Sequence, residues 1–224
     1  ASGMVLFQVS DTQAGLVEFT AQDQASSQVI GSVTVNFALV IPDDTNSGVA
    51  AAPDQVLASG QHTATITVVL RGEDGDPLSG RKILLTARDG HSAITPLNEI
   101  TDASGKATFT VTNTHVETVV YDAQDVASGK KLPPVEVQFI AGPVSAGKST
   151  VGLSRAEVIA DGKEAATITV TLQDAYGHLL SGRKVSVIAD SDHTVIGASD
   201  SGFTNEQGMV TFMVANTEAE TVTY

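Results

Sequence analysis

The stretch that decides the fold is ATITVVLRGEDGDPLSGRKI at residues 64–83, which returns as ATITVTLQDAYGHLLSGRKV at residues 166–185. The two stretches start at residues 64 and 166, so the offset is 102 positions. Downstream, TDASGKATFTVTNTHVETVVY ends at Tyr121, and its counterpart TNEQGMVTFMVANTEAETVTY ends at Tyr224, one residue out of step. A period of about 100 residues is too long for a solenoid unit and predicts a small domain with its own core.

Apolar and polar residues alternate within the repeated stretch. Ala64, Ile66, Val68 and Leu70 are apolar, and the threonines between them are polar and β-branched. A period of two is typical of a strand with one buried face. Pro53 breaks a leading strand over residues 49–57 and confines it to a sheet edge. The pattern predicts further strands around residues 83–87, 107–111, 119–123 and 135–139, and in the second copy a strand whose inward residues are Ala166, Ile168, Val170 and Leu172.

Short strands separated by Asp-Gly and Ser-Gly turns, with no convincing helical period, predict an all-β fold. Six or seven such strands in about 100 residues indicate tandem immunoglobulin-like antiparallel β-sandwiches. The chain has no tryptophan and no cysteine, so other large side chains must fill the core. The predicted core aromatics are Phe109, Tyr121 and Phe139, with Phe212 and Tyr224 in the second copy.

The alignment predicts three segments. Residues 1–40 are the carboxy-terminal remnant of a preceding repeat, residues 41–142 are a complete repeat (the first repeat), and residues 143–224 are a repeat without its last strand (the second repeat). The remnant carries a copy of that last strand, so one hypothesis is that residues 29–38 of one molecule complete the sheet of another by strand donation. The alternative is that the remnant, residues 1–38, is weakly ordered.

Composition limits the partners. The net charge is −14, from 26 acidic and 12 basic residues, which argues against nucleic acid as a partner. No apolar run approaches the roughly 18 residues that cross a bilayer, and the amino terminus does not resemble a signal peptide. We therefore expect any export or anchoring signal outside this sequence. Short linkers at residues 39–47 and 141–149 predict a semi-rigid rod of about 40 Å per repeat.

Several separated motifs carry a family resemblance. The string ADGKEAATITVTLQDAYG at residues 160–177 is followed by LSGRKV, TNEQGMVTF and NTEAETVTY. In this order they resemble the bacterial immunoglobulin-like (Big_1) repeats of the intimin and invasin family of inverse autotransporter adhesins. The first repeat departs from the pattern at Ser59 and at Gly72-Glu73. The resemblance implies a stalk of a cell-surface protein that a separate domain anchors in an outer membrane, with receptor binding located in other domains.

Each candidate site also has a plain structural interpretation. The histidines His62, His91, His115, His178 and His193 form no ligand cluster in the sequence, and His62, His115 and His178 are expected at exposed positions that tolerate exchange. Acidic residues in turns and at linkers offer candidate calcium sites, but solvated turn charges are the favoured interpretation. The acidic candidates are Glu73, Asp74 and Asp76; Asp174 in the second copy, beside Tyr176 and His178; and the pairs Asp43-Asp44 and Asp122-Asp125.

No catalytic motif is present, so the sequence predicts a non-enzymatic protein with no catalytic, cofactor or metal site. The leading hypothesis is a structural spacer that contacts neighbouring repeats and presents an adhesive domain, which would bind a host-cell surface protein or glycan. A second hypothesis is a direct binding module for a host protein, a glycan or another copy of the chain. A third is an accessory domain of an exported enzyme or a phage surface protein.

Overall fold

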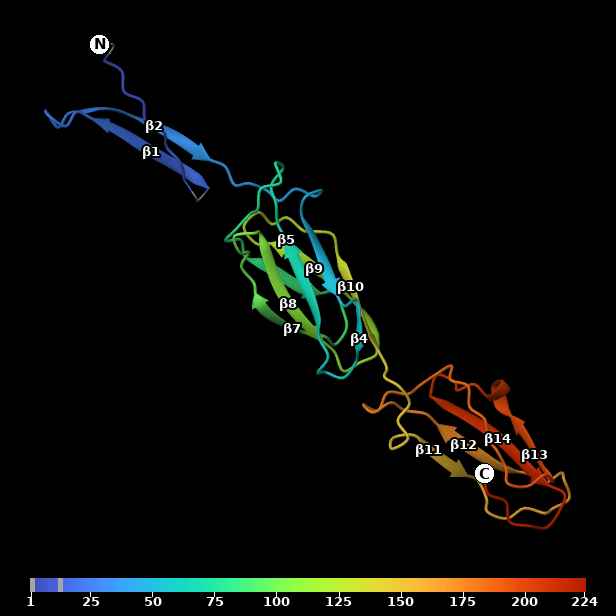
Figure 1. The fold of residues 1–224 in the computed structure, drawn as a ribbon. Helices are drawn as coiled ribbons and strands as arrows, with labels where there is room; N and C mark the ends of the chain where they lie inside the picture. Colours follow the sequence, from blue (N-terminus) through green and yellow to red (C-terminus); the bar gives the residue numbers. More distant parts are fainter. Residues whose placement is uncertain (1–2, 12–13) are drawn as a thin grey trace.

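The computed structural model describes residues 3–11 and 14–224; the parts of the predicted remnant at residues 1–2 and 12–13 lie outside the described residues. The chain forms three β units that follow one another in line (Figure 1). Its accessible surface is 13971 Å², whereas a compact protein of 23.0 kDa would expose roughly 9,600 Å². The excess surface agrees with the extended arrangement.

The first repeat is a sandwich of two four-stranded sheets. One sheet has the order β3-β5-β8-β7 and the other the order β4-β10-β9-β6. All neighbours pair antiparallel except β4 and β10, which are parallel. The strands are β3 (Gly48–Ala52), β4 (Gln55–Leu57), β5 (Ala64–Val69), β6 (Ile83–Ala87), β7 (Ala93–Asn98), β8 (Lys106–Thr112), β9 (Glu117–Asp125) and β10 (Val135–Ile140).

Alternation places the core between these sheets. Ala64, Ile66, Val68 and Leu70 are fully buried, as the period of two predicts. The predicted aromatics Phe109, Tyr121 and Phe139 are buried as well, and they supply the large side chains of this core. The all-β immunoglobulin-like fold class is therefore confirmed.

The edges of the sheets hold the differences from the sequence pattern. The leading strand over residues 49–57 is two strands, β3 and β4, which lie on either side of Pro53 and belong to different sheets. Both lie at sheet edges, as Pro53 predicts. The alternation did not predict β7, because Pro96 interrupts the run. A proline is tolerated there because β7 is also an edge strand, with a register shift between Pro96 and Asn98.

The second repeat forms one full sheet, of order β11-β12-β14-β13. Ile168, Val170 and Phe212 are buried in its core, while the predicted inward residue Leu172 is half-buried. Gly208 has a φ of 67° and approaches the backbone of Leu172 so closely that a side chain would not fit, and Gly105 does the same beside Leu70. The elements are β11 (Thr150–Leu153), β12 (Ala166–Thr171), β13 (Thr194–Ala198), the short 3-10 turn η1 (Ser199–Gly202) and β14 (Met209–Asn216).

The prediction that Tyr224 is a core residue is wrong, since 43% of it is exposed. In the first repeat β10 covers Tyr121 by pairing Val135 with it. The corresponding segment of the second repeat, residues 217–224, belongs to no strand and has no such partner among the described residues. Burial of a tyrosine at this position therefore requires a neighbouring strand, and the alternation of residues within the segment itself does not show whether that strand is present.

The amino-terminal unit is a hairpin of β1 (Gly15–Gln22) and β2 (Val29–Phe37). Phe19 pairs with Val33 and Val17 with Val35, which is the register of Tyr121 with Val135 and Val119 with Val137 after the 102-residue offset. The hairpin thus has the geometry of β9 and β10. After the same offset Phe7 corresponds to Phe109 of β8, but residues 3–11 form no strand and Phe7 is 84% exposed.

Candidate functional site at the junction between the repeats

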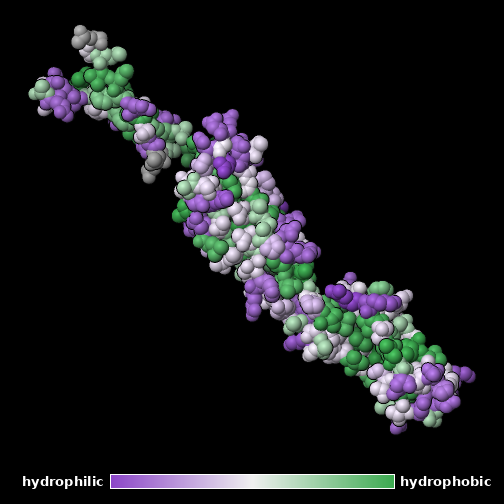
Figure 2. All heavy atoms as spheres, in the orientation of Figure 1, coloured by the Kyte–Doolittle hydropathy of each residue, from purple (hydrophilic) through white to green (hydrophobic). Residues whose placement is uncertain are grey.

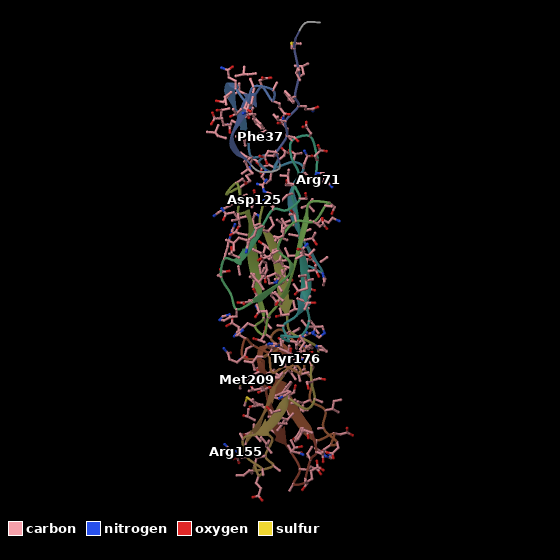
Figure 3. All side chains as sticks on the ribbon, turned by 90° about the vertical axis from the view of Figure 1, so that its left-hand side faces the viewer. Phe37, Arg71, Asp125, Arg155, Tyr176 and Met209 are labelled. Atoms are coloured by element: carbon pink, nitrogen blue, oxygen red, sulfur yellow. The ribbon has the colours of Figure 1, made fainter. Side chains whose placement is uncertain are left out.

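The contact between the two repeats is made by a turn of the second repeat and by loops of the first repeat, at the ends of the two units that face each other. The turn covers residues 174–178, and Figure 3 shows Tyr176 at the boundary between the two units. On the opposite side lies the loop that connects β8 to β9, which includes Thr114 and His115. This junction is the candidate functional site, because it decides how one repeat is held against the next.

Asp174 is the buried centre of the junction. Its side chain is fully buried and accepts hydrogen bonds from the backbone N–H groups of Gly142, Tyr176 and His178, the first at 2.7 Å. Burial alone would raise the pKa of Asp174, but these donors and the His178 ring outweigh it and lower the pKa to about 2. The carboxylate therefore stays charged and fixes the linker residue Gly142 to the second repeat.

His178 connects the two repeats. Its Nδ1 lies 2.8 Å from the Asp174 carboxylate, and its Nε2 lies 2.8 Å from the Thr114 carbonyl oxygen of the first repeat. Burial opposes the charged form, but the Thr114 carbonyl and the Asp174 carboxylate raise the pKa of His178 above its ordinary value. The expectation that His178 is exposed is wrong, because only 16% of its side chain is accessible.

The corresponding contact between the hairpin and the first repeat uses different chemistry. Val40 occupies the position of Gly142, and Gly72 occupies that of Asp174, after the 102-residue offset. A side-chain carbon on Gly72 would lie 3.3 Å from Val40, so the glycine leaves room for the valine. Arg81 also donates to the Val40 carbonyl at 2.9 Å. A large linker residue faces a glycine at one junction, and a linker glycine faces an aspartate at the other.

Asp125 is a second buried carboxylate, at the end of the first repeat next to the hairpin. Its side chain is fully buried and pairs with Arg81 and with the Ser128 hydroxyl. Figure 3 shows Asp125 and Arg71 at this end of the first repeat, near Phe37 of the hairpin. The ion pair fixes Arg81, which in turn holds the linker at Val40.

Three polar positions are used identically in both repeats, and alternation did not identify them. The Thr101 hydroxyl donates to the Leu78 carbonyl at 2.6 Å, and Thr204 does the same to Leu180. These groups lie in or beside the core, where each hydrogen bond satisfies a polar group that would otherwise be costly to bury. Their identity in the two copies was the available signal. The other pairs are Ser47 and Ser149, which bond the backbone of Arg71 and Gln173, and Asn113 and Asn216, which donate to Glu117 and Glu220.

The calcium candidates are dispersed over both repeats. Glu73, Asp74 and Asp76 are exposed on one turn. Protein groups bind the other carboxylates: Asp43 accepts from the backbone of Thr45 and Asn46, Asp44 pairs with Lys130, and Asp122 pairs with Arg88. Over residues 3–11 and 14–224 no three histidine or acidic side chains are grouped closely enough to hold a metal ion. The interpretation as solvated turn charges is wrong for Asp125 and Asp174, whose side chains are fully buried.

The remaining histidines lie at corresponding ends of the two repeats. His91 stacks on His115 with ring centroids 4.0 Å apart, and its backbone N–H donates to Glu117. His62 lies in a turn, where its ring contacts the Ser59 hydroxyl. His193 lies between Glu218 and Glu220 at the far end of the second repeat, with distances of 3.6 Å to each. Four of the five histidines therefore belong to the junction or to the end of the first repeat that faces it.

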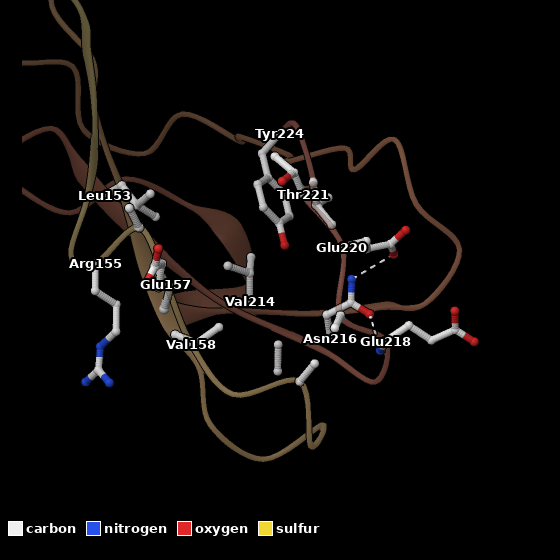
Figure 4. A pocket seen from close by; sticks show the side chains of 16 residues that line it. Leu153, Arg155, Glu157, Val158, Val214, Asn216, Glu218, Glu220, Thr221 and Tyr224 are labelled. Atoms are coloured by element: carbon white, nitrogen blue, oxygen red, sulfur yellow. Dashed lines mark hydrogen bonds between the residues drawn. The ribbon is translucent and has the colours of Figure 1, made fainter.

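The second repeat also has an open groove of about 430 Å³ (Figure 4). Leu153, Val158 and Val214 give it an apolar lining, and Tyr224 borders it. Val158 corresponds to Val56 of β4, which pairs with Phe139 of β10, so the groove lies where β10 lies in the first repeat. Figure 2 shows more apolar surface on the second repeat and the hairpin than on the first repeat, on the face in view.

The outward threonines pair across strands. Thr65 of β5 lies opposite Thr110 of β8, and Thr67 lies opposite Thr108. Cross-strand threonine pairs stabilise the solvent face of a sheet. Among the described residues, no helix is long and apolar enough to cross a membrane.

A two-sheet sandwich and a second β unit, held in line by a short linker whose Gly142 is hydrogen-bonded to Asp174, define a tandem immunoglobulin-like protein. The model of the bacterial Ig-like domain (group 1) family matches residues 46–140 and 148–224, and the chain belongs to this family. The resemblance found in the sequence is confirmed.

Individual bacterial proteins resemble the chain in sequence or in structure. The chain is 24% identical over 160 residues to the inverse autotransporter adhesin YeeJ of Escherichia coli (strain K12), covering 71% of this chain and 6% of YeeJ. The crystal structure of invasin, a bacterial integrin-binding protein, superposes with a TM-score of 0.64 and 24% identity over 93% of this chain and 41% of invasin. Yersinia pseudotuberculosis InvD gives a TM-score of 0.52 and 24% identity, over 78% of this chain and 50% of InvD. The chain therefore spans a small part of YeeJ and half or less of these structures.

Proposed function

We propose that this chain is a spacer segment of a bacterial cell-surface adhesin, holding an adhesive domain away from an outer membrane in which a separate domain is anchored. The observation that carries the proposal is the in-line arrangement of units with hydrogen-bonded junctions (Figure 1). Membership in the bacterial Ig-like family and similarity to adhesins support it. Receptor binding to a host protein or glycan belongs, in this proposal, to other domains.

The mechanism is mechanical. Each repeat resists extension through the hydrogen bonds between its own strands and through its own core. Each pair of neighbouring repeats adds one short interface to the stability of the rod. A linker that is bonded to the next repeat, as Gly142 is to Asp174, bends less than a free linker of the same length. The hydrogen bond between His178 and Thr114 adds a direct contact between the two repeats. The acidic surface, with a net charge of −14, keeps neighbouring stalks apart.

The test is to place residues 41–224 between a heterologous surface anchor and an adhesive tip of known receptor. A Gly/Ser linker of equal residue number is the matched control. We expect the natural segment to raise the tip further above the membrane and to support more receptor-mediated adhesion under flow than the flexible control. Equal tip height and equal adhesion in both would contradict a spacer role.

A second candidate is self-association by strand donation, favoured by the groove of the second repeat. We propose that β2 of a second copy occupies this groove. In the described chain β2 pairs with β1 along one edge only, and its Val33 is 66% exposed. The ladder register equates β2 with β10, the strand that fills the same place in the first repeat. An open edge beside an apolar groove is the feature that strand addition uses.

A further inference from the structure

The bridge between the repeats contains a proton that both of its hydrogen bonds require. The Asp174 carboxylate is ionised and can only accept, so His178 Nδ1 must carry a hydrogen to bond it at 2.8 Å. The Thr114 carbonyl also only accepts, so Nε2 must carry a hydrogen as well. A neutral imidazole has one N–H, and therefore only the charged imidazolium makes both bonds.

We propose that His178 is a pH-sensitive bridge that stiffens the junction between the two repeats in acid and loosens it in alkali. When the imidazolium loses its proton, one of its nitrogens presents a lone pair to an oxygen atom, and the two atoms then repel each other. The remaining N–H can serve Asp174 within the second repeat or Thr114 across the junction. The charged neighbour Asp174 holds the proton on Nδ1, so the hydrogen bond that breaks is the one between the repeats.

The surrounding groups are consistent with this assignment. On its own turn His178 faces Asp174 and the Tyr176 ring. The centroids of the Tyr176 and His178 rings are 6.3 Å apart. From the first repeat, His115 follows Thr114 directly and stacks on His91, which contacts Glu117. His62 lies in the next turn, whose Gly60 bonds the Asn113 carbonyl. His91, His115 and His62 lie close to the bridge, so the experiment must separate their effect from that of His178.

The sign of the effect follows from the direction of the pKa shift. The pKa of His178 is raised in the folded chain, so the interaction is fully present below the ordinary histidine value. It is lost as the pH rises through the folded-state pKa of His178. The hairpin junction places Gly72 and Asp76 at the positions of Asp174 and His178, so it has no equivalent bridge. The two junctions therefore differ in their response to pH.

The experiment uses the full chain, which has no natural cysteine. Lys106→Cys in the first repeat and Gln207→Cys in the second, both at exposed positions, carry a donor and an acceptor dye. We expect the distribution of single-molecule transfer efficiencies to be narrower at pH 5 than at pH 9. The pH at which the width of the distribution is halfway between its two limits should coincide with the midpoint of the His178 titration followed by nuclear magnetic resonance. Equal widths at the two pH values would overturn the proposal.

His178→Gln keeps a neutral N–H donor for Thr114 and removes the titration, so its distribution should not change with pH. The matched control is His193→Gln, at the far end of the second repeat, which should keep the full pH response. His91→Gln and His115→Gln should keep it too, and persistence of the response in His178→Gln would contradict the bridge. A measurement without substitution at His178 is the carbonyl carbon shift of Thr114, which should follow the His178 midpoint; a flat shift would also contradict it.

Discussion

The aromatic side chains at the centre of the first repeat carry much of its stability. Phe109 is 2% exposed and lies on β8 opposite Ile66 of β5. Phe109→Ala removes these contacts and leaves a cavity that the two sheets cannot close, so we expect a loss of about 3–5 kcal/mol in the free energy of unfolding. Urea denaturation of residues 41–142 measures it. Thr110→Ala, at the neighbouring outward position, is the control, and an equal loss in both variants would contradict the core assignment.

Tyr121 tests a different property of the same core. Tyr121 is fully buried. Within the described residues, neither the Tyr121 hydroxyl nor the buried Ser92 hydroxyl makes a hydrogen bond of ordinary geometry. Burial raises the pKa of Tyr121, which keeps the hydroxyl neutral. Tyr121→Phe removes a buried polar group without opening a cavity, so we expect thermal stability to be unchanged or higher. A loss of more than about 1 kcal/mol would show that the hydroxyl has a partner of ordinary strength.

The turn at residues 174–178 makes the stability of the second repeat depend on pH in the acid range. The pKa of Asp174 is lowered from 3.8 to about 2, so its contribution is present above its unfolded-state pKa and is lost as the pH falls towards 2. The difference corresponds to roughly 2 kcal/mol. We expect the second repeat to lose more thermal stability between pH 5 and pH 2.5 in the unsubstituted chain than in Asp174→Asn. Identical losses measured by calorimetry would contradict the role of the carboxylate.

The strands show which elements the sequence could predict. Strict alternation predicted β5, β8, β9 and β10, because each has one face in the core and one in solvent. Alternation missed β7, whose Pro96 is acceptable only at an edge, and it did not show that β3 and β4 belong to different sheets. Edge position depends on the arrangement of the whole sheet, and a local pattern does not contain it.

The junction was harder to predict than the strands. His178 and Thr114 are 64 residues apart, and the first repeat has Asp76 and Gly72 at the positions of His178 and Asp174, so the repeat itself does not point to their role. The available signal was the exchange of a valine and a glycine for Gly142 and Asp174 between the copies. Such a paired change indicates that two positions meet, but recognising it requires knowing which two positions to compare.

Strand donation between copies would change the mass of the protein in solution. If β2 of one copy fills the groove of another, the mass measured by light scattering should rise with concentration. A version without residues 1–38 should stay monomeric, and so should a full-length chain with Val33→Lys and Val35→Lys, which places charges on the donated strand. A concentration-independent monomer in the complete chain would end the proposal of strand donation.

The two repeats are joined by a single short linker, and the spacer role depends on their lying in line. Small-angle X-ray scattering of the 224-residue chain in dilute solution tests this arrangement most directly. We predict a pair-distance distribution with an early maximum at the width of one sandwich and a long tail along the rod. A single symmetric maximum, as a compact particle of the same mass gives, would contradict the spacer role.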